Sequence, residues 1–324
     1  MKNIIIIFTI ISAIFAEGIS GVSYFRYAVG SSSDEEDHGF YIDRAYLTYI
    51  KNVSDNVSFM FQSDIQNKGE AYYMYLKNAK MDYMVADNTK LTIGLQGMNM
   101  FSTQEKTWGN RFISKSAMDE SGWSPAADLG LGITQGFADV SLSLLYTNGE
   151  GYKSTSSDDN EKISIQVMYG EKRLDKNEGF NAGGVFSTLR YISVKDDTTT
   201  TDIDETEELP GTVMGIFGGF SGFGFRGGIE YNIGTDLNLD EDTTNATLMS
   251  LYGNYTISFV DGLSILVRYD IHDTEADDTE TTTLLAGLSY KCAEGITFSP
   301  NMTQTTVGTE DPTTAINLTF QLKF

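Results

Sequence analysis

Two histidines are the side chains in this sequence best suited to proton transfer. His38 follows Asp37, and His272 has Asp270 and Asp273 close by. A carboxylate that orients an imidazole is part of many catalytic sites, and both histidines fall near the ends of expected loops. Solvated loop histidines are the simpler interpretation of both positions. We therefore expect no catalytic site and no enzyme activity.

Carboxylates are the most abundant charged groups. The chain of 324 residues has 45 Asp and Glu against 22 Lys and Arg, a net charge of −23, which disfavours nucleic acid and anionic lipid headgroups as partners. Acidic runs such as 240–242 and 202–208 could collect Ca²⁺ or Mg²⁺ loosely through their oxygens. Charge runs are usually solvated, and no zinc spacing, nucleotide loop or helix–loop–helix calcium signature occurs. We expect no metal site and no cofactor.

Alternation of apolar and polar residues defines the elements that must position these charges. Segments of about 9–13 residues, the length of a tilted membrane strand, recur along the whole chain. They predict about sixteen strands, near residues 18–29, 39–51, 56–66, 71–83, 90–98, 125–135, 138–148, 161–171, 179–193, 211–220, 222–233, 243–258, 262–272, 281–291, 295–304 and 313–324. In the second of these, Asp43 and Arg44 both fall mid-strand, so one faces the wrong way or a β-bulge intervenes.

The last strand alternates up to the terminal carboxylate. Ile316, Leu318, Phe320, Leu322 and Phe324 would occupy one face. A final aromatic residue on such a strand resembles the terminal signal of bacterial outer-membrane β-barrels. Phe320, Leu322 and Phe324 would then be the residues that the barrel-assembly machinery recognises. The alternative is a final amphipathic strand of a soluble sandwich.

The amino-terminus indicates export. Lys2 precedes an apolar run, 4–15, that ends at Ala16, which predicts a signal peptide over 1–16 and a single barrel domain over 17–324. The run is too short to span a membrane, which takes about 20 apolar residues. Cys292 is the only cysteine, so no intrachain disulfide can form. A closed, fully hydrogen-bonded barrel would supply the missing restraint.

The connections alternate in length and charge. Those after even-numbered strands are short, whereas those after odd-numbered strands are longer and contain most of the acidic residues. Outer-membrane barrels have short periplasmic turns and long external loops, so this parity favours a barrel over a sandwich. It places an acidic mouth outside the cell, formed by Asp202, Asp204, Glu205, Glu207 and Glu208.

The longest odd connection, 99–124, differs from the others because it is not net acidic. Its aromatic and basic residues suggest that it packs inside the lumen and forms a constriction, whose residues would be Lys106, Trp108, Arg111, Lys115 and Asp119. An ordered external lid or a short surface helix are the alternatives. The polar strand faces would line the pore with Asp64, Asp82, Gln96, Asp128, Arg190, Arg226, Glu230, Arg268 and Asp270.

Several stretches resemble outer-membrane porins of the phosphate-selective O/P type. They are 40–49 (FYIDRAYLTY), the turn 53–56, 91–97 (LTIGLQG) and 108–111 (WGNR), and the likeness is specific over about residues 39–135. The resemblance implies a sixteen-stranded barrel, often a homotrimer, with its third external loop folded into the pore. The excess of acids departs from what a phosphate pore needs, since phosphate is held by arginine and lysine.

We therefore predict an outer-membrane porin of a Gram-negative-type envelope, in contact with lipid, through which small hydrophilic solutes and ions diffuse passively. Acidic loops would give it a weak preference for cations. The alternatives are a phosphate- or anion-selective porin, and a non-conducting structural barrel with cation-binding acidic loops.

Overall fold

The computed structural model describes residues 18–31, 38–68, 71–154, 161–194, 206–235, 237, 245–274 and 280–324. The predicted signal peptide, 1–16, lies outside these residues, and so do Asp202, Asp204 and Glu205. Within the described ranges, no helix is long and apolar enough to cross a membrane.

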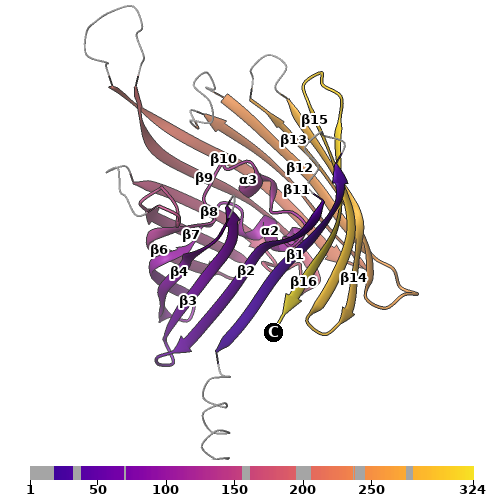
Figure 1. Ribbon diagram of the computed structural model, residues 1–324. Helices are drawn as coiled ribbons and strands as arrows, with labels where there is room; N and C mark the ends of the chain where they lie inside the picture. The colour runs from indigo at the N-terminus through magenta and orange to yellow at the C-terminus, as the bar shows by residue number, and fades with distance from the viewer. Residues whose placement is uncertain are drawn as a thin grey trace, which may run out of the picture.

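Sixteen antiparallel strands in this part of the chain form one closed barrel, each paired with its neighbours in sequence (Figure 1). The strands are β1 (Ile19–Ser31), β2 (Gly39–Asn52), β3 (Val57–Lys68), β4 (Ala71–Ala86), β5 (Thr89–Gly97), β6 (Ala127–Phe137), β7 (Val140–Thr147), β8 (Lys162–Gly170), β9 (Gly179–Val194), β10 (Thr206–Gly222), β11 (Phe225–Thr235), β12 (Asn245–Thr256), β13 (Leu263–Asp273), β14 (Thr281–Ala293), β15 (Ile296–Val307) and β16 (Thr313–Lys323). Two short helices, α2 (Ser102–Trp108) and α3 (Ala117–Glu120), lie between β5 and β6.

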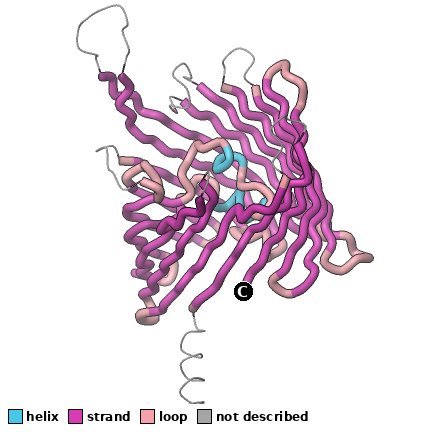
Figure 2. The backbone as a smooth tube through the Cα atoms, viewed as in Figure 1, coloured by secondary structure: helices cyan, strands magenta, loops and turns pink. Residues whose placement is uncertain are grey.

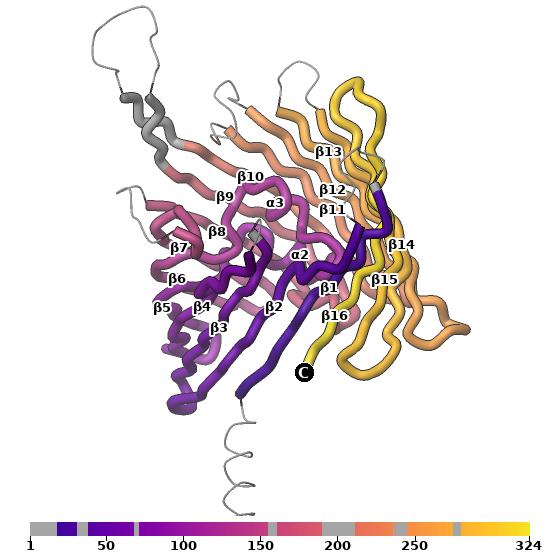
Figure 3. Tube along the Cα trace, viewed as in Figure 1, coloured from indigo at the N-terminus to yellow at the C-terminus, as the bar shows by residue number. Residues whose placement is uncertain are grey.

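The first and last strands close the barrel. β1 and β16 pair antiparallel, with Phe25 opposite Phe320, and Figure 3 shows the indigo start of the described chain beside its yellow end. The N–H of Gly21 donates to the carbonyl of Phe324 at 3.1 Å, and the N–H of Phe324 donates to the carbonyl of Gly21 at 3.1 Å. The terminal alternating segment is therefore a strand of a closed barrel and not of a sandwich.

The two faces of the wall differ as the alternation predicts. Along β11, Ile229, Tyr231 and Ile233 are 38–49% exposed, whereas Glu230 and Asn232 between them are 0–1% exposed. The same alternation places large apolar side chains on the outer surface of most other strands. A barrel satisfies its backbone groups internally and can present such a surface to lipid, so this is a transmembrane barrel.

Strand β2 contains a β-bulge at the position where the alternation was ambiguous. Tyr24 of β1 pairs with Arg44, but the next pair is Phe25 with Ile42, so Asp43 is the extra residue. A bulge turns two successive side chains toward one face. Both Asp43 and Arg44 accordingly border the same internal cavity, and of the two alternatives at this position the structure shows the bulge.

The connections confirm the predicted parity. The turns at 53–56, 87–88, 138–139, 171–178, 223–224, 257–262 and 294–295 lie at one end of the barrel. Most connections at the other end are longer, with the exceptions of 69–70 and 308–312. This is the architecture of a bacterial outer-membrane barrel. We call the two ends the short-turn end and the long-loop end.

Strand boundaries match the predicted segments within a few residues except at β10. This strand begins at Thr206 and not at 211, because its ladder with β9 continues through Glu207 opposite Ser193 and Glu208 opposite Ile192. The expectation that Glu207 and Glu208 lie in a loop is therefore wrong. Backbone pairing between two long neighbouring strands extends past the point where the side-chain alternation ends.

Candidate functional site

The segment between β5 and β6, residues 98–126, packs against the inner face of the wall. Figure 2 shows its two helices, in cyan, within the outline of the barrel. Its Met100, Met118 and Trp123 share a buried apolar cluster with inward side chains of β8, β9, β10 and β12, among them Met168 and Phe217. Apolar burial of this kind stabilises a segment that the barrel itself does not require.

Trp108 at the end of α2 is the most deeply packed aromatic residue of the segment. It is 1% exposed, and its ring meets that of Tyr252 on β12 edge-on, with centroids 5.7 Å apart. Gly109 ends the helix with φ +70°, and a Cβ there would lie 2.7 Å from the guanidinium of Arg226. The Arg226 guanidinium donates to the Trp108 carbonyl at 3.1 Å. Glycine therefore allows the close approach that this contact needs.

Further hydrogen bonds hold the segment to the same part of the wall. Asn110 Nδ2 donates to Asn254 Oδ1 at 2.6 Å, and Arg268 donates to the Lys115 carbonyl. Trp123 Nε1 donates to Nε2 of His272 at 3.3 Å. His272 is thus a hydrogen-bond acceptor for the segment, while His38 is an exposed residue at the long-loop end.

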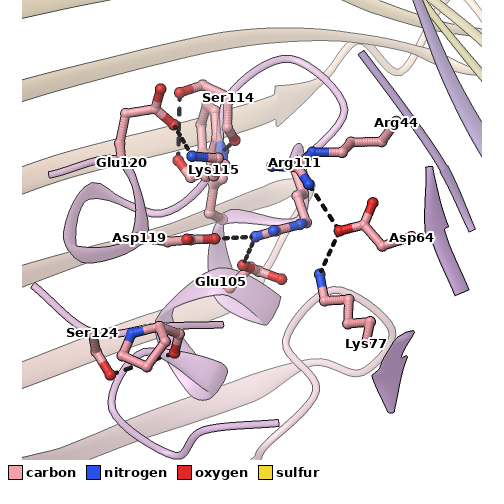
Figure 4. Close-up of polar contacts among 12 residues, drawn as sticks. Arg44, Asp64, Lys77, Glu105, Arg111, Ser114, Lys115, Asp119, Glu120 and Ser124 are labelled. Carbon is pink, nitrogen blue, oxygen red and sulfur yellow. Dashed lines mark hydrogen bonds and ion pairs between the residues drawn. The ribbon is translucent and has the colours of Figure 1, made fainter. Parts of the chain in front are cut away.

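Arg111 organises the charges at the tip of the segment (Figure 4). It bonds to Glu105 and, at 2.6 Å, to Asp119, while Lys115 Nζ lies 3.7 Å from Glu120. Burial works to lower the pKa of Arg111, but the nearby carboxylates, Glu105 foremost, outweigh it and hold that pKa well above its usual value. The guanidinium is therefore a permanent cation whose charge is balanced within the segment.

A second connection, 148–154 between β7 and β8, also folds inward. Asp128 accepts the N–H groups of Gly149 at 2.6 Å and Gly151 at 3.2 Å, and the Tyr152 hydroxyl donates to Asp64 at 2.6 Å. Burial, and then the hydrogen bond to Asp64, raise the pKa of Tyr152, so this hydroxyl keeps its proton. No pattern in the sequence indicates that this loop turns inward.

Asp64 on β3 joins this loop to the two strands that flank β3. Its carboxylate is fully buried and accepts from Arg44 of β2 at 2.8 Å, with Lys77 of β4 at 4.0 Å (Figure 4). Lys77 also lies over the ring of Tyr46, 4.6 Å from its centroid. A buried carboxylate needs such partners, because desolvation of an unpaired charge is costly.

Three cavities border the 98–126 segment. Two lie toward the long-loop end: one of about 600 Å³ reaches from β1–β2 to β12–β15, and one of about 470 Å³ lies beside the 148–154 loop. Arg44, Arg111 and Lys115 border both. The third, of about 410 Å³, lies toward the short-turn end between β3–β8 and the start of the segment. Within the described residues, no group of three His, Cys, Asp or Glu side chains could hold a metal ion.

The predicted site residues divide into three groups. Those that border a cavity are Gln96, Lys106, Arg111, Lys115, Asp119, Asp128 and Asp270, although Asp128 is 1% exposed and serves mainly to hold the 148–154 loop. Those engaged in ion pairs or packing are Asp64, Asp82, Trp108, Arg226, Glu230 and Arg268. Those whose side chains lie outside the described part of the chain are Arg190, Asp202, Asp204, Glu205, Glu207 and Glu208.

Sequence reasoning overlooked several basic residues that border the cavities: Arg26, Arg44, Lys80, Lys90, Lys153, Lys162 and Lys172. Those within strands lie at polar-face positions, so a complete inventory of these faces would have found them. Lys153 and Lys172 lie in connections, where no alternation indicates a direction.

No protein-family model matches the chain, and no curated protein sequence matches it. Solved structures do. They include OprB of Pseudomonas putida, which is 10% identical, with 97% of this chain and 96% of that chain covered and a TM-score of 0.71. An anion-selective porin of Comamonas acidovorans is also 10% identical, with 94% of this chain and 98% of that chain covered and a TM-score of 0.67. A trimer form of OmpT, an outer membrane protein of Vibrio cholerae, matches with 12% identity, 94% and 98% coverage and a TM-score of 0.65. The chain therefore has the fold of the outer-membrane porin barrels.

Proposed function

We propose that the protein is a porin of the outer membrane through which small hydrophilic solutes and ions diffuse passively. The observation that carries the proposal is the pair of water-accessible regions on either side of the 98–126 segment, both inside a closed barrel with an apolar outer surface. Lys106, Arg111, Lys115 and Asp119 of this segment would border the narrowest passage, which Trp108 supports from behind.

Selectivity would be set mainly at the mouth. Long connections rich in Asp and Glu follow the strands that end at the long-loop end, and a net charge of −23 is concentrated there in the sequence. Carboxylates at a pore mouth raise the local concentration of cations over about a Debye length, roughly 8–10 Å at physiological salt. We propose a weak cation preference. The cavity of about 600 Å³ at the long-loop end has both acidic and basic residues on its walls, so it would leave this preference unchanged.

The runner-up is a porin selective for anions such as phosphate. The basic residues that border the cavities favour it, and one structural neighbour is described as an anion-selective porin. A non-conducting structural barrel comes next. In each case the partners would be outer-membrane lipid and the barrel-assembly machinery acting on Phe320, Leu322 and Phe324, with a homotrimer as the assembly, and none of these functions involves catalysis.

Single-channel conductance and the zero-current potential in a salt gradient test the proposal. We expect stepwise insertion and a small potential of the cation sign. Replacing Asp202, Asp204, Glu205, Glu207 and Glu208 together by their amides should reduce this potential, and the reduction should shrink at high salt. An anion-sign potential in the unmodified protein would favour the runner-up, and folded protein that gives no steps would contradict a porin.

A further inference from the structure

The wall of the barrel has a notch at the long-loop end, where β5 is shorter than its neighbour β4. The ladder between β4 and β5 ends with Ala79 opposite Leu95, whereas the ladder between β4 and β3 continues to Ala71. Beyond β5 the chain turns into the lumen as the 98–126 segment. Within the described chain, residues 71–78 of β4 therefore pair with β3 alone. An absent strand corresponds to roughly 10 Å between the backbones of its two neighbours.

The 148–154 loop closes this notch from the lumen side. The ring of Tyr152 meets that of Tyr75 on β4 edge-on, with centroids 6.3 Å apart. The backbone N–H of Tyr152 donates to the Ala127 carbonyl at 2.9 Å, so the loop continues along β6 where β7 has ended. The inner half of the notch is thus filled by the chain itself.

A cavity of about 350 Å³ occupies the outer half of the notch, and this volume lies within the range of roughly 300–1,000 Å³ typical of ligand sites. Its apolar lining comes from outward-facing residues of three strands: Leu76, Leu95 and Leu129. Asn148 and Glu150 of the loop supply polar groups. Glu150 also borders the luminal cavity of about 470 Å³, so the loop forms the partition between the lumen and this outer space.

The outer cavity opens onto the lipid-facing surface of the barrel. Leu76 and Leu129 are exposed, and Met74 and Tyr72 continue the same outward face of β4 toward the long-loop end. Apolar side chains therefore extend past the cavity on the side of the mouth. Aromatic residues such as tyrosine are typical of the level where acyl chains meet headgroups. The notch accordingly lies at the depth of the upper part of the acyl chains.

We propose that the notch binds the acyl chain of a membrane phospholipid, which completes the wall where β5 is missing. The cavity is continuous with the surface that already contacts lipid, and its three leucines would pack along the chain. The Asn148 amide can donate to an ester oxygen at the headgroup end. Headgroup oxygens and their water can satisfy the backbone groups of 71–78 that a neighbouring strand would otherwise pair. The proposal needs the transmembrane barrel but not the porin function.

A phosphatidylcholine with a photoreactive diazirine in one acyl chain tests the proposal, in phosphatidylcholine vesicles that hold the folded protein. Labelled peptides are mapped by mass spectrometry after illumination. We expect the lipid-facing residues of the notch to take about fivefold more label than those of β13, a strand paired along both edges, because one additional hydrogen bond shifts occupancy by about this factor. Leu95→Trp should fill the notch and remove the excess label.

Leu91→Trp is the matched control. Leu91 lies on the same outward face of β5 but does not border the cavity, so the excess label should remain in this variant. The outer faces of membrane barrels carry aromatic residues, so both variants should fold, which the shift in electrophoretic mobility between heated and unheated protein checks.

Even labelling along the wall, or an excess that persists in Leu95→Trp, would overturn the proposal. Cross-links from the notch to a second chain in place of lipid label would assign it to a contact between copies, and would overturn the proposal as well. The label is measured without any current. A barrel that takes label in the notch but gives no conductance steps would retain the lipid site and reject the porin.

Discussion

The larger cavity at the long-loop end and the cavity at the short-turn end treat their charges differently. In the former, Arg26 pairs with Asp43 and Arg44 pairs with Asp64, and the segment's own Arg111 and Lys115 are also paired with carboxylates. In the latter, two lysines share one carboxylate and two have none. The 98–126 segment thus borders one cavity whose basic groups are paired with carboxylates and one cavity in which two lysines are not.

The difference indicates what each set of charges does. Paired charges around a buried carboxylate such as Asp64 stabilise the arrangement of the strands and the inward loops, and their fields largely cancel at a distance. Unpaired lysines beside water contribute little to stability, but their field acts on any ion that comes near. The comparison therefore separates residues that maintain the pore from residues that interact with solutes.

The largest effect should come from detaching the 98–126 segment, which lies between the two cavities. Trp108→Ala would leave a large cavity against Tyr252 and should lower the free energy of unfolding by about 3–5 kcal/mol. The segment should then leave the wall, and single-channel conductance should rise. Phe223→Ala, at a turn position that is 93% exposed, is the control. Conductance that stays at the wild-type value after a measured loss of stability would show that the segment does not limit the passage.

A smaller effect should distinguish the compensated charges from the uncompensated ones. Arg44→Met removes the 2.8 Å partner of fully buried Asp64 and should destabilise the protein by about 1.5–3 kcal/mol in a denaturant titration. Lys106→Met should cost nothing or stabilise slightly, because it removes a partly desolvated charge that has no partner. Asp64→Asn in the Arg44→Met background should recover part of the loss. If Arg44→Met and Lys106→Met lowered the free energy of unfolding equally, the difference between paired and unpaired charges would be contradicted.

The strands of this barrel could be predicted from the sequence more fully than the contacts inside it. Alternation located every strand, and it indicated the bulge at Asp43, because side-chain period and burial are local properties of a strand. The inward turn of 148–154 depends on Tyr152 reaching Asp64, which is 88 residues away along the chain. The lysines of the short-turn cavity likewise come from four elements whose proximity appears only once the barrel has closed. Contacts of this kind have no local signature.

The smallest expected effect is a dependence of ion preference on pH, to which Lys106 of the short-turn cavity should contribute. Burial and the neighbouring Arg173 lower the pKa of Lys106, so this lysine loses its proton at a lower pH than an ordinary lysine does. Its positive charge is present at neutral pH and disappears as the pH rises through the lowered pKa. The zero-current potential should therefore shift toward the cation sign in the alkaline range just below the usual lysine pKa. At the long-loop end Arg111 keeps its charge there, and the raised pKa of Tyr152 keeps that hydroxyl neutral. Burial and then Arg44 lower the pKa of Lys153, so this lysine of the 148–154 loop should contribute to the same change. Lys106→Gln should show part of the shift already at neutral pH and should lose that part of the alkaline change, while Lys172 and Lys153 account for the rest. Lys51→Gln, at an exposed position of β2, should retain the whole change. If Lys106→Gln titrates like the wild type, the uncompensated lysines do not act on permeating ions, and the two cavities differ in structure alone.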